Sequence, residues 1–366
     1  MRIFRVSAEQ FVELEALPQD LPAGSYIWIG SERREFDQRQ GELQTALARW
    51  GEAALVELHV SDLLNDHLPS HFDYTSWYDL LVFRRLAAAA GSAAHPSEQA
   101  SATSAAARRA LDAVDTRPVG FAIFERVLIT VHPEDCAVRE HFATRLAGLA
   151  AAAEPRNQGR LPASPADQMV RMLNHMVDSY LDLRRLFTRQ LGQLQQQLLD
   201  PKSRFKDWAV LLESRNALHL LEDICEDQRS AVQEWIDTLD EGPDEPEAER
   251  RRERELLRVR GRDVLEHVER VLSHVRRLEQ SAETAVQMHF SALGHRTNDI
   301  MRTLTVLTAI FMPLNLITGF FGMNFEFLPL IHEARGLWFA VGLMLAVGLG
   351  LLWFFRRKRY LGRSQR

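Results

Sequence analysis

The pattern of hydrophobic and polar residues changes character along this chain of 366 residues. In residues 1–163, short apolar runs alternate with amphipathic stretches, which predicts a mixed α/β domain. An Ala/Ser-rich stretch at about 87–116 lacks this periodicity and predicts a flexible insertion. The individual runs predict strands at 25–29, 53–58, 79–84 and within 119–131, and helices at 42–50 and 133–152.

From Ser164 onward the pattern is purely helical. Ser164 followed by Pro165 is a favourable helix start, because proline suits the first turn. Two long helices are predicted at 164–199 and 204–239, and an acidic turn closes a helical hairpin over residues 164–246.

A third helix is predicted to begin near residue 247 and to continue without proline as far as Pro313. If it reaches Gly322 it is roughly 110 Å long, and residues 247–302 form a stalk that leads into an apolar segment. Apolar residues alternate spacings of four and three along the stalk, a coiled-coil-like stripe suited to packing against its own copies or the preceding helices. The stripe consists of Val264, Val268, Val271, Val275, Leu278, Ala282 and Ala285.

Two uncharged apolar stretches close the chain. No charged residue occurs from Thr303 to Phe325 or from Gly336 to Phe355. A helix needs about 20 residues to cross a bilayer core. We therefore expect spans at 303–325 and 336–355, an extracytoplasmic loop at 326–335 and a basic cytoplasmic tail at 356–366.

Basic residues flank these spans on one side. His295, Arg296 and Arg302 precede the first span and the run 356–359 follows the second, whereas the loop carries Glu326, Glu333 and a single Arg335. The positive-inside rule then puts both termini in the cytoplasm. No apolar segment of a signal peptide follows Met1, so we expect a multi-pass protein of the cell (inner) membrane.

Along the first span, small, polar and soft residues again recur at spacings of three and four. A polar side chain is costly against acyl chains, so this stripe should face protein or water. Helix packing is the simpler interpretation, and a pore wall in a symmetric assembly is the one we favour. Leu304 and Met312 are candidate constrictions that gate by dewetting. The stripe consists of Asn298, Met301, Thr305, Thr308, Met312, Asn315 and Gly319.

Composition and spacing argue against other classes of function. The net charge of −6 and the pI of about 6.1 argue against nucleic-acid binding. Cys136 and Cys225 fit no metal or redox spacing, so we expect buried thiols.

A histidine- and aspartate-rich segment at 59–73 could indicate a metallohydrolase. Pro69, however, breaks the helix that would place His67 and His71 on one face. No nucleotide-binding loop is visible, so we expect neither an enzyme nor an organic cofactor.

Residues 308–314 and 319–327, which include Gly322-Met323-Asn324, resemble the CorA magnesium/cobalt transporters. Weaker matches occur in the right order at 28–29, 59–64, 128–132, 262–264 and 298–302. The resemblance implies a funnel-shaped homopentameric channel with an α+β cytosolic domain, a long helical stalk and two transmembrane helices. It implies influx of Mg²⁺, and also of Co²⁺ and Ni²⁺.

The resemblance also implies roles for individual residues. Asn324, with Gly322 and Met323, would form a ring that selects the hydrated ion, since amide oxygens can accept hydrogen bonds from its waters. Glu326 would concentrate cations at the mouth. One departure is that Pro329 is followed by Leu330-Ile331, where the family usually has an acid.

In the family, divalent cations between cytosolic domains hold the pore shut. By alignment, Asp263 and Asp62 would form such a regulatory site for Mg²⁺ between subunits. The alternatives are a solvated Asp263 or its ion pair with Arg260 or Arg262, and a helix cap for Asp62.

Two other functions stay open at this point. A zinc or transition-metal transporter resembling ZntB would share the fold, although Met323 favours magnesium. A membrane-anchored scaffold or sensor would use the spans only as an anchor, and would not need the polar residues of the first span.

Overall fold

The computed structural model describes residues 1–88, 114–134, 137–151, 160–199, 208–242, 247–323 and 334–358. The chain divides into two compact units, residues 1–283 and residues 284–366. The division falls inside one helix, α8 (Ala248–Phe321). Each unit is described by itself below.

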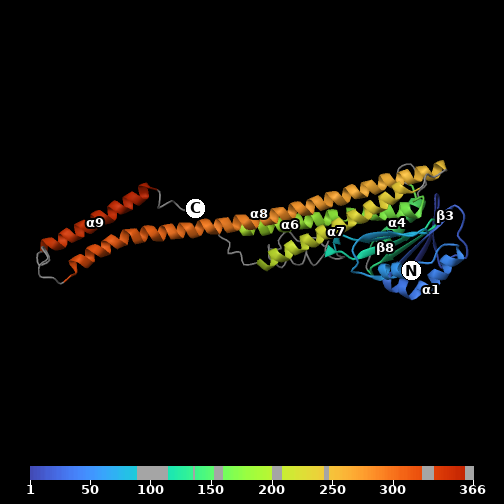
Figure 1. Ribbon diagram of the computed structural model, residues 1–366, viewed down its shortest axis with the longest axis horizontal. Helices are drawn as coiled ribbons and strands as arrows, with labels where there is room; N and C mark the ends of the chain where they lie inside the picture. The colour runs from blue at the N-terminus through green and yellow to red at the C-terminus, as the bar shows by residue number, and fades with distance from the viewer. Residues whose placement is uncertain are drawn as a thin grey trace. The chain divides into compact units, whose positions relative to one another are not determined.

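The first unit is built on a mixed seven-stranded sheet of order β2-β1-β3-β9-β8-β5-β4 (Figure 1). Strands β3 and β9 are parallel neighbours, and the other neighbouring pairs are antiparallel. The strands are β1 (Arg2–Ser7), β2 (Phe11–Leu14), β3 (Ser25–Glu32), β4 (His71–Tyr74), β5 (Asp79–Arg84), β8 (Pro118–Ile123) and β9 (Val127–His132). The short strands β6 (Ala87–Ala88) and β7 (Val114–Asp115) pair with each other at the edges of the predicted insertion, whose residues 89–113 lie outside the described ranges.

Helices cover both faces of the sheet. Successive strand residues point to opposite sides, so apolar strands supply buried residues to both faces. On one face, Ile27 and Ile29 share a buried cluster with Phe36 of α1 (Arg33–Arg49) and Leu63 of α2 (Glu57–Leu64). On the other, Trp28 belongs to a second cluster that includes residues of α4 (Ala137–Ala151) and α5 (Pro165–Asp178).

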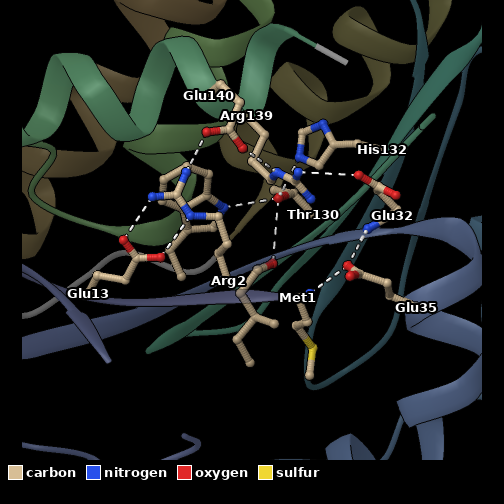
Figure 2. A network of polar contacts seen from close by, with 11 residues as sticks. Met1, Arg2, Glu13, Glu32, Glu35, Thr130, His132, Arg139 and Glu140 are labelled. Carbon is tan, nitrogen blue, oxygen red and sulfur yellow. Dashed lines mark hydrogen bonds and ion pairs between the residues drawn. The ribbon is translucent and has the colours of Figure 1, made fainter. Parts of the chain in front are cut away.

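Polar contacts fasten the N-terminus to the sheet and its helices, as Figure 2 shows. The amino group of Met1 bonds Glu35 of α1. Arg2 bonds Glu13 of β2 through two nitrogens, at 2.7 and 2.8 Å, and also Glu140 of α4. This network joins four elements at one edge of the domain.

Two predictions needed correction, and three strands were missed. Residues 53–58 were predicted as a strand, but residues 53–56 form a loop and residues 57–58 begin α2, whose buried Val60 and Leu63 follow a helical period. The helix predicted over 164–199 is two helices, α5 and α6 (Tyr180–Leu199), separated at Ser179. Strands β1, β2 and β4 had not been predicted.

The predicted helix start at Ser164 is confirmed, because its side chain accepts a hydrogen bond from the backbone N–H of Asp167. Helix α7 (Trp208–Glu241) and the single 74-residue helix α8 also match the helical predictions.

The apolar stripe of α8 packs against the preceding helices, which was one of its two predicted roles. Val264, Val268 and Val275 are fully or almost fully buried. Gly261 allows close approach to α7, since a Cβ atom there would lie 2.8 Å from the Trp235 ring. On the α6 side, the Tyr180 hydroxyl lies 2.8 Å from His274 Nδ1.

The second unit contains the end of α8 and helix α9 (Ala334–Arg357). Both helices are long and apolar enough to cross a membrane. Within this unit, Val306 of α8 and Ala340 of α9 are buried, and Gly348 of α9 faces Leu314 of α8. The two helices therefore share an apolar contact.

Candidate functional site

The stripe predicted on the first span is uncovered in the described chain, as are neighbouring positions outside it such as Leu307, Phe311 and Leu316. Met301, Leu304 and Met312 are 58%, 57% and 71% exposed, whereas Val306 is only 3% exposed. Asn298, Thr305, Thr308, Asn315 and Gly319 are exposed as well. Helix α9 covers the side that carries Val306 and Leu314, so the stripe is left without cover in the described chain.

The threonine hydroxyls of the stripe are arranged as hydrogen-bond acceptors. Thr305 Oγ1 donates to the Met301 carbonyl at 2.8 Å, and Thr308 Oγ1 donates to the Leu304 carbonyl at 2.9 Å. A hydroxyl has one proton, so once it is donated the oxygen can only accept further bonds. Such an oxygen suits a donor like the water shell of a cation.

The middle of the stripe is hollowed. Met301, Leu304, Thr305, Thr308, Ala309 and Met312 together line a hollow on the helix surface. Its lining combines two hydroxyl oxygens with soft apolar side chains. The hollow is therefore neither wholly polar nor wholly apolar.

Helix α8 ends at the predicted filter. The Gly322 N–H bonds the Thr318 carbonyl at 2.9 Å, and a Cβ atom at residue 322 would lie 3.0 Å from that carbonyl oxygen. A side chain there would press on the last helical turn, so glycine suits the position. Met323 is 43% exposed, while Asn324 and Glu326 lie outside the described residues.

In the first unit, Asp263 of α8 lies in a polar cluster with residues of α5. Asn174 Nδ2 is 3.4 Å from Asp263 Oδ2, and His267 Nδ1 is 2.9 Å from Asn174 Oδ1. His267 also lies 3.6 Å from Asp178 Oδ1 and 3.9 Å from Asp263 Oδ1. The cluster offers carboxylate, amide and imidazole groups that can bind a metal ion at the surface of the stalk.

The alternative ion pairs proposed for Asp263 are not formed in the structure. Arg260 pairs instead with the buried Asp167, and Arg262 with Asp240 at 3.8 Å. The side chain of Asp263 is 53% exposed, so it is open to a further ligand.

Asp62 lies in the second turn of α2, and the N-cap of that helix is Val56. The cap alternative for Asp62 is therefore wrong. Its Oδ2 atom lies 3.9 Å from His71 Nε2, and the Asp62 side chain is 19% exposed. Within the described chain, Asp62 and Asp263 have different neighbours, and the structure leaves their pairing between subunits a prediction.

Sequence reasoning had missed Asn174, Asp178 and His267. Each of the two helices carries its pair at a spacing of four residues: Asn174 and Asp178 on α5, and Asp263 and His267 on α8. That spacing puts each pair on one helical face. The signal was present, but only the packing of α5 on α8 brings the pairs together.

The histidines of the segment 59–73 do not form a catalytic centre. His59 is buried between the Tyr78 hydroxyl at 2.8 Å and Asp73 Oδ2 at 3.1 Å, so its two ring nitrogens are both engaged. His67 is largely exposed beside Asp66.

Cys225 is fully buried, and burial raises the pKa of its thiol to about 12. It is therefore an unreactive core residue, as expected. Cys136 lies outside the described residues.

Comparisons with known proteins place these features in one family. Residues 98–357 match the family described as "CorA-like Mg2+ transporter protein". The cobalt/magnesium transport protein CorA of Thermotoga maritima is 29% identical over 100 residues, which cover 27% of this chain and 28% of that protein. The magnesium transport protein CorA of Haemophilus influenzae (strain Rd) is 33% identical over 100 residues, 27% of this chain and 32% of that protein.

These alignments span less than a third of the length of each relative. The fold extends much further: the complete structure of the CorA magnesium transporter from Methanocaldococcus jannaschii matches with a TM-score of 0.68 at 16% identity, covering 100% of this chain and 98% of that one. The family is one of ion transporters, which rules out the enzyme alternative. Since the family match covers well over half of the sequence, the chain belongs to the CorA-like Mg²⁺ transporter family.

Proposed function

We propose that this chain is one subunit of a homopentameric channel that carries Mg²⁺, and also Co²⁺ and Ni²⁺, into the cell. The observation that carries the proposal is the uncovered stripe on α8, which leads directly to Gly322-Met323-Asn324. Polar groups such as Asn315 are costly in lipid, and copies of the same stripe around an axis would give them a water-filled pathway. A membrane-anchored scaffold would not need these polar residues in its span.

In this proposal the selected ion keeps its water shell. Mg²⁺ dehydrates reluctantly, so a ring of Asn324 amide oxygens would bind the waters around it and not the metal itself. Thr305 and Thr308 would continue the same chemistry along the pore, because their hydroxyl oxygens are held as acceptors. Neutral groups bind weakly enough to allow release, which conduction requires.

The proposed orientation follows from charge. Arg302 at one end of the first span and Arg356-Arg357-Lys358 after the second would lie in the cytoplasm of the inner-membrane orientation. Asn324 and Glu326 would then lie at the outer mouth. Glu326 and Glu333 would attract cations there, with Arg335 opposing them.

The proposed regulation uses the cytosolic face of the stalk. Asp263 and Asp62 of neighbouring subunits would repel each other unless a hard cation such as Mg²⁺ bridges them. Loss of cytosolic Mg²⁺ would loosen the closed assembly, so the pore would open when the ion is scarce. The support from the structure is that Asp263 is half exposed and has no arginine partner among the described residues.

The central test is ion flux into liposomes by the purified protein, comparing Mg²⁺, Co²⁺, Ni²⁺ and Zn²⁺. Asn324→Ala should abolish selective Mg²⁺ flux and leave the pentamer intact in size-exclusion chromatography with light scattering. Asn216→Ala, at an exposed position on α7, is the matched control and should transport normally. Normal Mg²⁺ flux through Asn324→Ala would rule out the filter, and dominant Zn²⁺ flux would favour the ZntB-like alternative.

A second test addresses regulation. Asp263→Lys should make transport insensitive to Mg²⁺ on the cytosolic side, because a fixed positive charge replaces the bridging cation. Asp237→Lys changes charge equally at another exposed helical position and should remain inhibited. Unchanged inhibition in Asp263→Lys would remove Asp263 from the sensor.

A further inference from the structure

Three side chains that can bind a metal gather between α7 and α8 in the first unit. His219 and Glu222 lie one turn apart on α7, and Glu279 lies on α8. One ligand atom from each side chain lies within 4.8 Å of the other two. Along α8, Glu279 is sixteen residues beyond Asp263 (279 − 263), or about 24 Å, so this group is separate from the Asp263 cluster.

The distances suit a shared ion. His219 Nε2 lies 3.0 Å from Glu279 Oε1, a direct contact that an ion would replace. Two ligands of one metal, at about 2.1 Å each, would lie about 3 Å apart at right angles and about 3.4 Å apart in a tetrahedral site. The side chains of Glu222 and Glu279 are each only 21% exposed, so they are held partly inside the helix pair and need little reordering.

The kinds of ligand atom decide which ion fits. Mg²⁺ prefers oxygen ligands and keeps several waters, whereas an imidazole nitrogen suits Zn²⁺, Co²⁺ and Ni²⁺. We propose that His219, Glu222 and Glu279 form a binding site for a divalent transition-metal ion that joins α7 to α8. With three protein ligands, the remaining coordination positions would be filled by water.

Arg276 competes with the metal for this site. Its Nε atom donates to Glu222 Oε1 at 2.6 Å, and the same guanidinium also bonds Glu226. The metal must therefore use the second oxygen of Glu222 or displace the arginine. Removal of Arg276 should strengthen metal binding, whereas removal of His219 should weaken it.

Binding would fasten two helices that lie side by side in Figure 1. Arg276 and Glu279 lie one turn apart on α8, so the metal would add a second cross-link beside the existing ion pair. The site would bind cobalt, nickel or zinc ions at a position on α8 different from that of the proposed Mg²⁺ sensor.

Cobalt titration of the full-length protein in detergent tests the site, because bound Co²⁺ has visible absorption bands that report its ligands. The wild type should bind one more Co²⁺ per chain than His219→Ala, and Zn²⁺ should displace it while excess Mg²⁺ should not. His219→Ala should weaken Co²⁺ binding at this site at least about tenfold. His67→Ala, which removes an exposed histidine beside Asp66, is the matched control and should keep the wild-type stoichiometry.

The Arg276→Gln variant should bind Co²⁺ more tightly than the wild type, because it lacks the guanidinium group that competes for Glu222. Equal cobalt stoichiometry in the wild type and His219→Ala, displacement by Mg²⁺, or weaker binding in Arg276→Gln would each overturn the assignment. Thermal unfolding without metal verifies that the variants are folded. The readout is binding, so a failure of Mg²⁺ flux in the transport assay would leave this result unaffected.

Discussion

Two parts of helix α8 carry stripes with the same spacing and reach opposite outcomes. In the first unit, Val264, Val268 and Val275 are at most 1% exposed, because α6 and α7 of the same chain cover them. In the second unit, Met301, Leu304 and Met312 are more than half exposed. Spacings of three and four therefore predict that one face of the helix differs from the others. They do not say whether that face contacts other helices of the same chain, other subunits or water.

The chemistry of the residues makes the distinction. The covered stripe is made of valine, leucine and alanine, which gain free energy simply by leaving water. The uncovered stripe mixes asparagine, threonine and glycine with methionine, and lipid is a poor solvent for its amides and hydroxyls. The first stripe should thus determine stability, and the second should determine transport.

The largest effect is expected from a charge placed in the covered stripe. Val268 is fully buried, so Val268→Asp would bury an unpaired carboxylate and should destabilise the protein by about 3–5 kcal/mol. Chemical unfolding in detergent measures the change. Val259→Asp, at a position on α8 that is 56% exposed, should change stability by less than about 0.5 kcal/mol. Equal effects at the two positions would contradict the assigned packing.

In the uncovered stripe, a polar residue should matter for transport and not for stability. Asn315→Leu should lower Mg²⁺ flux at least tenfold, about 1.4 kcal/mol in barrier height, with an unchanged unfolding midpoint. Leu316→Val, at the neighbouring exposed position, is the control and should retain flux. Full Mg²⁺ flux in Asn315→Leu would show that the stripe packs against other helices.

A smaller effect is expected from one hydroxyl. Thr308→Val keeps the shape but removes an oxygen that can accept a bond from the water shell, so flux should fall roughly threefold, or about 0.6 kcal/mol. Thr303→Val loses a similar bond, from Thr303 Oγ1 to the Asp299 carbonyl at 2.8 Å, outside the stripe. A comparable loss of flux in both variants would mean that the hydroxyls act only on the helix backbone.

The smallest effect concerns pH and His274, which precedes Val275 of the covered stripe. Burial, followed by the charges of Arg184 and Arg277, lowers the pKa of His274, which contacts the Tyr180 hydroxyl. The unfolded chain therefore binds protons more readily, and stability should fall as the pH drops through about 6.5. Between pH 7.5 and 5.5, the Tm of the wild type should fall about 1–2 °C more than that of His274→Gln. Parallel pH curves would exclude His274 as the cause.

Much of this architecture was predictable because its signals are local. The continuity of α8 as far as Pro313 follows from the absence of proline before that residue, and the start of α5 follows from Ser164-Pro165. The failure at 53–58 is instructive. Leu55, Val60 and Leu63 are buried while Leu58 is 63% exposed, so the residues of α2 follow a helical period, although the apolar run reads like a strand.

The candidate sites divide in the same way. The stripe on the first span follows from spacing within one helix. By contrast, Asn174 meets Asp263 across a separation of 89 residues, and His219 meets Glu279 only because α7 packs on α8. Such meetings depend on tertiary packing, which no local pattern in a single sequence contains.

Pro313 interrupts the hydrogen-bonding of α8 where the stripe is hollowed. Proline has no N–H, so the Ala309 carbonyl one turn earlier lacks its α-helical donor. In hydrocarbon, an unsatisfied carbonyl is costly and must find another partner. Ala309 lines the hollow, where a passing water molecule could donate that bond. In the proposed channel, the helix itself would thus supply a backbone oxygen to the pore, independent of any side chain.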